Sequence, residues 1–350
     1  MQNEIKVLMI GPARSVNGGI SAVVNNYYEV GLDKKVHLKY IGTMEDGSKF
    51  HKLFIAIKAF FQYFFCVRKY DIVHVNMASD VSIYRKMIFI WIAVWRKKKI
   101  IIHQHGGNFE QFYYEECSHK KRKLIQKTLN QAEYLLVIAP YLKELFSDIV
   151  DSDKIIVFPN SIAVPAYKEK DYTAQKILFL GRLCKEKGIQ ELLDAVEELK
   201  KTYSGLQLYL GGYWVHEDLR QQADENKEWI KQLGWVKKEE KRKYLEECNI
   251  FVMPSYFEGQ SVSLAEGMAY SCACVASNVG GIPQMIVQGK TGILVESKNT
   301  ESLKKGIELL LKDTELQKNM GQAARTKIDT EFNLDKNLEK LLKIYEKIVV

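Results

Sequence analysis

Several common features are missing from this sequence. Its six cysteines are scattered and form no CxxC pair, which excludes a disulfide scaffold and disfavours a cysteine zinc site. The N-terminal residues lack the long apolar stretch and the cleavage site of a signal peptide, and no apolar run reaches the roughly 20 residues that span a bilayer. A GxGxxG dinucleotide fingerprint is absent as well. We therefore expect a cytoplasmic protein with reduced thiols.

The composition is that of an ordinary soluble globular protein. Hydrophobic residues make up 47% and charged residues 27% of the 350 residues, which excludes wholesale disorder, a collagen-like fibre and a polytopic membrane protein. The formal net charge of +8 favours an anionic partner, either a nucleic acid, a phosphorylated small molecule or an anionic membrane. Nucleic acid fits worst, because the aromatic residues do not interleave with a basic stripe, and we predict no such partner.

Strands and helices alternate along the chain in two series. The first begins with a buried strand at 5–10, a glycine loop containing Gly18 and Gly19, and a helix at 20–30. The second begins near residue 176, after a polar loop at 163–174. This alternation predicts parallel sheets with helices on both faces, an α/β fold. The further expected strands are 36–41, 72–76, 100–104, 134–138, 155–158, 177–180, 206–210, 250–253, 273–277 and 292–295, and helices are expected at 217–232 and 300–312.

Two apolar stretches allow two interpretations. Residues 54–67 are rich in Phe but interrupted by Lys58 and Gln62, and residues 87–95 run into the basic segment 96–99. Both stretches can be core helices, which is the ordinary interpretation. Alternatively they form a helical face that docks on an anionic membrane, assisted by the cations at 120–123.

The segment 254–269, PSYFEGQSVSLAEGMA, follows a strand and enters a helix. The unpaired N–H groups at a helix N-terminus suit phosphate, and Glu266 within the helix can accept hydrogen bonds from two vicinal hydroxyls. Glu258 lies eight residues earlier, on the turn before the helix. On spacing alone, an ordinary surface helix with two solvated glutamates explains the same pattern.

Two further segments follow strands. In GRLCKEKG, at 181–188, Arg182 and Lys187 come at the carboxyl end of a strand, where two fixed cations can neutralise a diphosphate. A charged surface loop is the alternative. In IIIHQHGGN, at 100–108, His103 and His105 point to one side of a strand. No third zinc ligand is evident, so we predict no metal site, with one histidine facing substrate and the other in the core.

In order along the chain, these segments resemble the family-4 retaining glycosyltransferases of GT-B fold. The resemblance covers most of the chain and is densest in its C-terminal half. The segments that carry it are Gly18-Gly19, His105-Gly106, Pro159-Asn160, GRLCKEKG at 181–188, LGWV at 233–236, the E-x7-E pair Glu258 and Glu266, and GGIP at 280–283.

The resemblance implies a role for each matching residue. Arg182 and Lys187 match the basic pair on the donor diphosphate, Glu266 the residue that binds the ribose hydroxyls, and Glu258 the one that contacts the transferred sugar. Gly19 matches a glycine that approaches the distal phosphate, and His105 the histidine beside the sugar. The remaining donor-binding residues implied are Gly18, Asn160, Val236, Gly259, Gln260, Ser261 and Val262.

The resemblance also implies fold, domains and activity. It predicts two Rossmann-like domains facing a cleft, at 1–165 for the acceptor and 166–330 for the nucleotide sugar, with the helix at 331–350 returning to the first. The expected activity is metal-independent, retaining hexosyl transfer without a cofactor, from a nucleotide-diphosphate sugar, UDP-linked by family frequency, to a glycan or lipid-linked saccharide. Polysaccharide synthesis such as capsule assembly, in the cytoplasm or peripherally on the inner membrane face, is our hypothesis.

The alternatives are a nucleotide-sugar epimerase and a non-catalytic nucleotide- or glycan-binding protein of the same fold. Three departures from the family pattern lie around the nucleotide side and leave the base and sugar open. Gln284 follows GGIP where Glu is common, Gly212-Tyr213 replaces a smaller acidic turn, and Cys272-Ala273-Cys274 replaces a glycine and proline approach.

Overall fold

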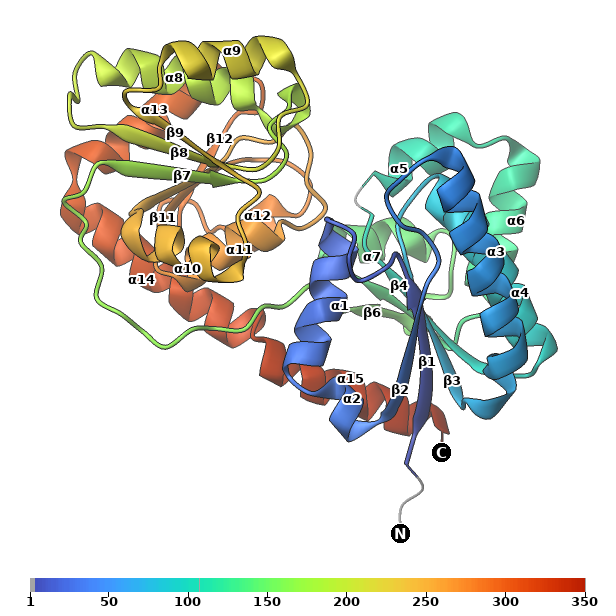
Figure 1. The fold of residues 1–350 in the computed structure, drawn as a ribbon. Coiled ribbons are helices and arrows are strands. Elements are labelled where there is room, and N and C mark those ends of the chain that lie inside the picture. The colour runs from blue at the N-terminus through green and yellow to red at the C-terminus, as the bar shows by residue number, and fades with distance from the viewer. Residues whose placement is uncertain (1–3, 107, 350) are drawn as a thin grey trace. The chain divides into compact units, whose positions relative to one another are not determined.

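The computed structural model describes residues 4–106 and 108–349, so that Gly107 after the His105-Gly106 pair lies outside the described residues. The chain divides into two compact units (Figure 1). The N-terminal unit comprises residues 1–163 and 334–350, and the C-terminal unit comprises residues 164–333. The sequence placed these boundaries at 165/166 and 330/331, two or three residues away.

The N-terminal unit is built on a six-stranded sheet in the order β2-β1-β3-β4-β5-β6, and every pair is parallel. The four inner strands are buried almost throughout because helices cover both faces, whereas the edge strands β2 and β6 are mostly half-buried. The strands are β1 Lys6–Gly11, β2 His37–Gly42, β3 Ile72–Met77, β4 Lys99–Gln104, β5 Tyr134–Val137 and β6 Ile155–Val157.

Right-handed crossovers divide the helices between the two faces of this sheet (Figure 1). One face carries α1 Gly19–Glu29 and α15 Leu334–Val349, and the other carries α3 Lys49–Cys66, α4 Val81–Trp95 and α6 His119–Leu129. Helix α15 buries Leu338, Leu341 and Tyr345 in the N-terminal unit, which gives that unit the last helix of the chain. The short helices are α2 Leu32–Lys35, α5 Phe109–Gln111 and α7 Pro140–Ser147.

The C-terminal unit repeats the architecture with a parallel sheet in the order β12-β11-β10-β7-β8-β9. The two parallel six-stranded sheets confirm the predicted α/β class. The strands are β7 Lys176–Leu180, β8 Gln207–Gly211, β9 Ile230–Gly234, β10 Ile250–Met253, β11 Ala273–Ser277 and β12 Ile293–Val295. The helices are α8 Ile189–Lys200, α9 Glu217–Glu225, α10 Lys238–Glu247, α11 Val262–Ala269, α12 Ile282–Met285, α13 Thr300–Lys312 and α14 Thr314–Glu331.

Two sequence predictions need correction. The helix expected at 217–232 ends at Glu225, and Ile230–Gly234 is the edge strand β9 beside β8. Five residues of this type are long enough for a strand but too few to show a period of their own. The second prediction was that no apolar run is long enough to span a bilayer. Among the described residues, Lys49–Lys69 is long and apolar enough to cross a membrane, by length and composition only, with 17% of it buried.

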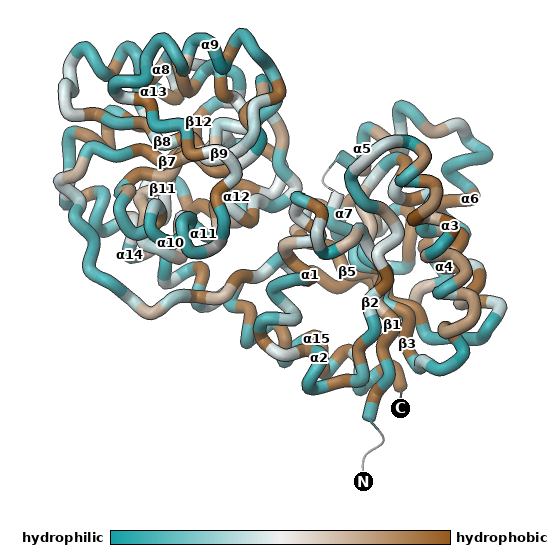
Figure 2. The backbone as a smooth tube through the Cα atoms, in the orientation of Figure 1, coloured by the Kyte–Doolittle hydropathy of each residue, from teal (hydrophilic) through white to brown (hydrophobic). Residues whose placement is uncertain are grey.

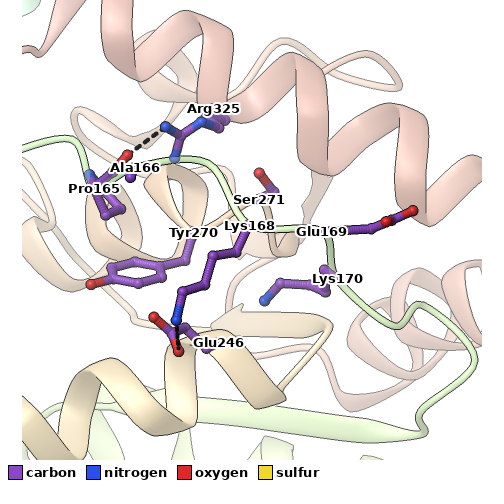
Figure 3. A pocket seen from close by; sticks show the side chains of 9 residues that line it. All are labelled: Pro165, Ala166, Lys168, Glu169, Lys170, Glu246, Tyr270, Ser271 and Arg325. Atoms are coloured by element: carbon purple, nitrogen blue, oxygen red, sulfur yellow. Dashed lines mark hydrogen bonds and ion pairs between the residues drawn. The ribbon is translucent and has the colours of Figure 1, made fainter.

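The segment that enters the C-terminal unit is held in place by charged side chains around a cavity of about 160 Å³ (Figure 3). Lys170 is buried and donates hydrogen bonds to the carbonyl oxygens of Leu245 and Cys248, both at 2.6 Å. Arg325 donates to the Pro165 carbonyl oxygen, and Lys168 pairs with Glu246 at 2.9 Å. The cations here are committed to holding the chain, so we assign this cavity a structural role.

Candidate active site

The candidate donor site lies at the carboxyl ends of the strands in the C-terminal unit. The loops after β7, β8 and β9 are joined there by backbone hydrogen bonds, with Gly181 N–H donating to Gly211 and Gly212 N–H donating to Gly234. Val236 packs over the same point, where a Cβ on Gly211 would lie 3.0 Å from its side chain. Parallel sheets bind ligands at this edge, because loops from neighbouring strands converge there.

The two cations of 181–188 differ in their surroundings. Arg182 is exposed, and within the part of the chain that the structure describes its side chain makes no hydrogen bond or ion pair. Lys187 ends the short helical turn Lys185–Lys187 and is partly buried, with its Nζ 2.5 Å from Glu258 Oε1. The predicted diphosphate cation and the predicted sugar-binding glutamate therefore form one ion pair.

Close backbone packing brings this pair together. Gly188 has φ +69°, and a Cβ there would lie 2.0 Å from the Pro254 carbonyl oxygen, so the loop can approach only with glycine at this position. Gly280, with φ +52°, fits in the same way against the Glu258 carbonyl oxygen, which accepts a hydrogen bond from Gly281 N–H at 3.0 Å. Gly188 of the 181–188 segment and Gly280 of the 280–283 segment therefore let these two loops pack against the backbone of the segment that carries Glu258.

The E-x7-E segment forms the turn and helix that the sequence predicts. Ser261 is the N-cap of α11, and its Oγ accepts a hydrogen bond from Leu264 N–H at 3.2 Å. Gln260 and Ser261 are buried, whereas Gly259 and Val262 are half-buried. Ser255 Oγ donates to Glu258 Oε1 at 2.9 Å and orients that carboxylate. Glu266, on α11, pairs with Lys241 of α10, a residue that the sequence analysis missed.

In the N-terminal unit, the candidate histidine is held by two asparagines. His105 Nδ1 lies 3.1 Å from Asn160 Oδ1, and its Nε2 lies 3.0 Å from Asn76 Oδ1. Burial lowers the pKa of His105 to about 4, so the ring is neutral at pH 7 and donates through only one nitrogen. Asn160 therefore positions His105 in this structure. Asn76 is a second partner of His105, and no sequence motif predicted it.

The second histidine of this strand has a different environment. His103 is fully buried, with its ring centroid 3.9 Å from that of His105. Gly18 and Gly19, at the start of α1, are exposed, and no atom of the described chain lies within 4 Å of a Cβ built on either. Within residues 4–106 and 108–349, no group of three His, Cys, Asp or Glu side chains suits a metal ion.

A second cavity, of about 420 Å³, opens in the N-terminal unit. It lies where β1 and β2 end, and helix α3 forms one wall. The lining combines cations, an acid and two tyrosines, and the Arg14 guanidinium stacks 3.7 Å from the centroid of the Tyr28 ring. Its polar and aromatic lining residues include Arg14, Tyr28, Tyr40, Glu45, Lys58 and Gln62.

Chemically, the donor edge can bind a phosphorylated ligand. Arg182 and Lys187 supply positive charge, and the Ser261-capped end of α11 adds free N–H groups and the positive end of a helix dipole. The carboxylates of Glu258 and Glu266 are acceptors for hydroxyl groups. Both carboxylates are already paired with lysines, Lys187 and Lys241, so hydroxyls would exchange with these pairs or share them.

Comparison with solved structures gives the fold class. HepE from Anabaena, in its complex with UDP-glucose, superposes with a TM-score of 0.79 over 98% of this chain and 100% of its own, at 14% identity. A glycosyltransferase from Rickettsia africae superposes with a TM-score of 0.75 at 19% identity, over 99% of each chain. These neighbours place the protein in the GT-B class of two-sheet α/β folds.

Sequence comparison relates the C-terminal unit to known glycosyltransferases. Residues 164–327, which span most of that unit, match the family model "Glycosyl transferases group 1". An uncharacterized glycosyltransferase from Methanocaldococcus jannaschii is 25% identical over 230 residues, and this chain spans 64% of its length. A 41.2 kDa protein of the cps region of Klebsiella pneumoniae is 24% identical over 332 residues, or 85% of this chain and 87% of that protein.

Proposed function

We propose that this protein is a retaining glycosyltransferase that moves a hexosyl unit from a nucleotide-diphosphate sugar to a glycan or lipid-linked saccharide. One observation carries the proposal. Inside the glycosyl transferase group 1 domain, Arg182 and the Lys187–Glu258 pair lie on loops packed against each other beside the capped N-terminus of α11. This arrangement offers cations to a diphosphate and a carboxylate to a sugar.

The residues act on charge that develops during transfer. The bond from the anomeric carbon to the donor phosphate oxygen breaks, and a bond from the acceptor hydroxyl oxygen forms on the same face. Arg182, Lys187 and the N–H groups of α11 stabilise the leaving diphosphate, a kind of stabilisation typically worth about 3–4 kcal/mol per interaction. A donor phosphate oxygen takes the acceptor proton, and Glu258 positions the sugar. Because these cations balance the charge of the diphosphate, the transfer that we propose uses neither a metal ion nor a cofactor.

We propose UDP as the nucleotide. The support is that HepE, which shares the fold, is described in complexes with UDP and UDP-glucose. Glu266 would accept the ribose hydroxyls, with Lys241 holding the carboxylate in place until the nucleotide binds. Gly18, Gly19, Val236 and the backbone of Gly259 to Val262 keep the donor-binding roles that the family resemblance implies.

The acceptor is proposed to bind the 420 Å³ cavity of the N-terminal unit, whose tyrosines and charged groups suit a saccharide. Neutral His105 is proposed to contact the transferred sugar as a hydrogen-bonding group, because a ring with a pKa of about 4 carries no charge at pH 7. The cps-region relative supports a role in capsular or other cell-surface polysaccharide synthesis. We propose a cytoplasmic location. A lipid-linked acceptor would bring the protein to the inner membrane face, so the proposal includes peripheral contact with an anionic membrane.

The test is a thermal-shift panel with UDP, GDP, ADP, CMP and dTDP. A nucleotide present at 100 times its Kd should add roughly 2.7 kcal/mol to the free energy of unfolding. We expect UDP to stabilise the wild type and the control Lys185→Ala, whose lysine pairs with Asp218 at the surface. Arg182→Ala and Glu266→Ala should lose the effect while remaining folded.

A second measurement separates transfer from the alternatives. UDP-glucose and related donors labelled in the sugar are incubated with the protein, and free sugar and UDP are quantified. Slow donor hydrolysis that is lost in Arg182→Ala supports a transferase. Interconversion of the sugar without release of UDP would indicate an epimerase, and nucleotide binding without turnover of any donor would indicate a binding protein. Failure of every nucleotide to stabilise the folded protein overturns the proposal.

A further inference from the structure

We infer that α3, α4 and α6 of the N-terminal unit form a face that docks on an anionic lipid surface, with α3 lying in the plane of the interface. We call this surface the α3–α4–α6 face. Much of α3 and α4 is hydrophobic (Figure 2), although both helices lie on the outside of the sheet. The inference rests on the proposed function only in linking the face to a lipid-borne acceptor.

The exposed side of α3 carries an apolar stripe at helical spacing. Its members point to solvent although they are large, with Phe50 86%, Phe65 71% and Phe54 64% exposed. The inward side of the helix packs Ala59 and Tyr63 against the core of the N-terminal unit. A helix with two apolar sides normally lies between two apolar layers, and only one of them is protein here. The full stripe is Phe50, Leu53, Phe54, Ile57, Phe61 and Phe65.

The helix is placed to lie on a bilayer rather than to cross it. Strands β2 and β3, at its two ends, belong to the same sheet, so α3 is the crossover that connects them. Tyr63 is fully buried and donates a hydrogen bond from its hydroxyl to the Phe89 carbonyl oxygen at 2.9 Å. Spanning would break these contacts and carry Lys58 into the hydrocarbon.

The apolar surface continues from α3 onto the neighbouring helices. A groove of about 470 Å³ between α3, α4 and α6 is lined by aromatic and aliphatic side chains, among them Phe64, Trp91, Trp95 and Leu124. Trp95 is 62% exposed, and the Arg96 guanidinium stacks on its ring, 3.8 Å from the centroid. Exposed tryptophan beside arginine is typical of the interface between lipid headgroups and acyl chains.

Charge decides which partner fits this face. The segments 47–70, 81–99 and 118–132 contain five, six and five Lys or Arg residues and no Asp or Glu. Lys86 among them is buried and does not contribute to the face. A second copy of the chain docking through the same face would bring these like charges together. A surface of anionic headgroups over an apolar layer complements both the cations and the exposed aromatic rings.

The face is continuous with the proposed acceptor cavity through α3. Ile55, Lys58 and Gln62 line the cavity, while Phe54, Ile57 and Phe61, next to them in sequence, belong to the exposed stripe. Docking would therefore hold the cavity at headgroup height. The substrate class that follows is a saccharide on a membrane lipid whose phosphate can meet Lys58 or Arg14.

The experiment is vesicle co-sedimentation of the full-length protein. Vesicles of phosphatidylcholine alone are compared with vesicles containing about one third phosphatidylglycerol, which supplies the anionic surface. We expect binding to the anionic vesicles at low salt, weaker binding at high salt and little binding to phosphatidylcholine. The double variant Phe54→Ser/Phe61→Ser should bind at least about tenfold more weakly, and each of Lys120→Gln and Lys123→Gln about fivefold.

Matched controls come from the C-terminal unit. Leu309→Ser changes an apolar side chain that is 49% exposed, and Lys318→Gln changes an exposed lysine, and both should bind vesicles like the wild type. A second readout needs no change to α3. Brominated lipid should quench tryptophan fluorescence, and Trp95→Phe should remove much of the quenching.

Several results would overturn the inference. One is the absence of binding to anionic vesicles, and another is equal weakening in the Leu309→Ser control. A dimer in sedimentation that dissociates in Phe54→Ser/Phe61→Ser without any vesicle binding would make the face a protein interface. Resistance to alkaline carbonate extraction would make α3 a spanning helix. Stabilisation by UDP is measured on the same variants, so that loss of docking with nucleotide binding intact separates this inference from the proposed function.

Discussion

At the scale of single residues, we predict different effects on kcat for substitutions of the two lysines in the 185–187 turn. Lys187 pairs with half-buried Glu258, whereas Lys185 pairs with Asp218 at the surface, 2.8 Å apart. Lys187→Ala should lower kcat by about 10²–10³ because it removes a cation from the leaving diphosphate. Lys185→Ala should leave kcat within about twofold, since exposed ion pairs contribute little. Steady-state kinetics with the donor found in the nucleotide panel provides the measurement, and equal losses would contradict the assignment.

Buried histidines should make the stability of the N-terminal unit depend on pH. Burial lowers the pKa of His74, whose Nδ1 lies 2.6 Å from the Tyr345 hydroxyl, to about 3, below the ordinary value of 6.5. The unfolded chain therefore binds the proton first as the pH falls, and stability that is complete above pH 6.5 is lost toward pH 3. Between pH 7 and pH 5 the loss should be about 2 kcal/mol for His74.

Urea unfolding at the two pH values measures this loss. His74→Gln should show a drop in unfolding free energy about 2 kcal/mol smaller than that of the wild type, because the substituted side chain does not titrate. His51→Gln, which changes an exposed histidine paired with Glu45, is the control and should keep the drop of the wild type. The same drop in both variants would mean that His74 does not contribute and that other groups, such as His103, His105 or carboxylates, cause the pH dependence.

The sequence indicated individual site residues better than their partners. Glu258, Glu266, Arg182 and Lys187 belong to motifs whose spacing relative to strands and helices can be read along the chain. Lys241 comes from a different helix and meets Glu266 only after folding. Contacts of this kind leave no local pattern, so they were missed.

At the scale of elements, alanine substitutions at two glycines can distinguish the cost of backbone strain from the cost of a steric clash. Gly188 and Gly289 have φ values of +69° and +72°, so an alanine costs about 1–2 kcal/mol of left-handed strain at either position. Only at Gly188 would the new Cβ also meet a carbonyl oxygen, that of Pro254. Gly188→Ala should therefore lower the Tm more than Gly289→Ala and also reduce kcat, by moving Lys187 away from Glu258. Calorimetry and kinetics check this, and equal Tm changes would contradict it.

Some regular elements could be predicted from the sequence with the right bounds. The expected strand at 273–277 and helix at 300–312 agree with β11 and α13 residue for residue. Strand β9 was taken for the end of a helix because its pairing with β8, rather than its five-residue sequence, makes it a strand. The exposure of the α3 stripe was equally invisible in sequence, since an apolar helix looks the same whether protein or lipid covers it.

At the scale of the whole molecule, the last helix should stabilise the first unit rather than the second. Leu341 is fully buried in α15, which belongs to the N-terminal unit, so Leu341→Ala should cost about 2–5 kcal/mol there. Val349→Ala, at a position 44% exposed, should change the stability by less than about 0.5 kcal/mol. Hydrogen exchange should accelerate in β1 to β4 for Leu341→Ala and remain unchanged in β7 to β11. Faster exchange in the C-terminal unit would contradict this assignment.

The sequence by itself determined the α/β class, the two series of strands and helices, and the motifs at the carboxyl ends of strands, because periodicity and turn residues are local properties. The tertiary structure decided which residues meet. It paired Lys187 with Glu258 and Lys241 with Glu266, placed His105 between Asn76 and Asn160, and left the α3 stripe uncovered. These outcomes depend on strand order and close backbone packing between distant segments, which no local pattern encodes.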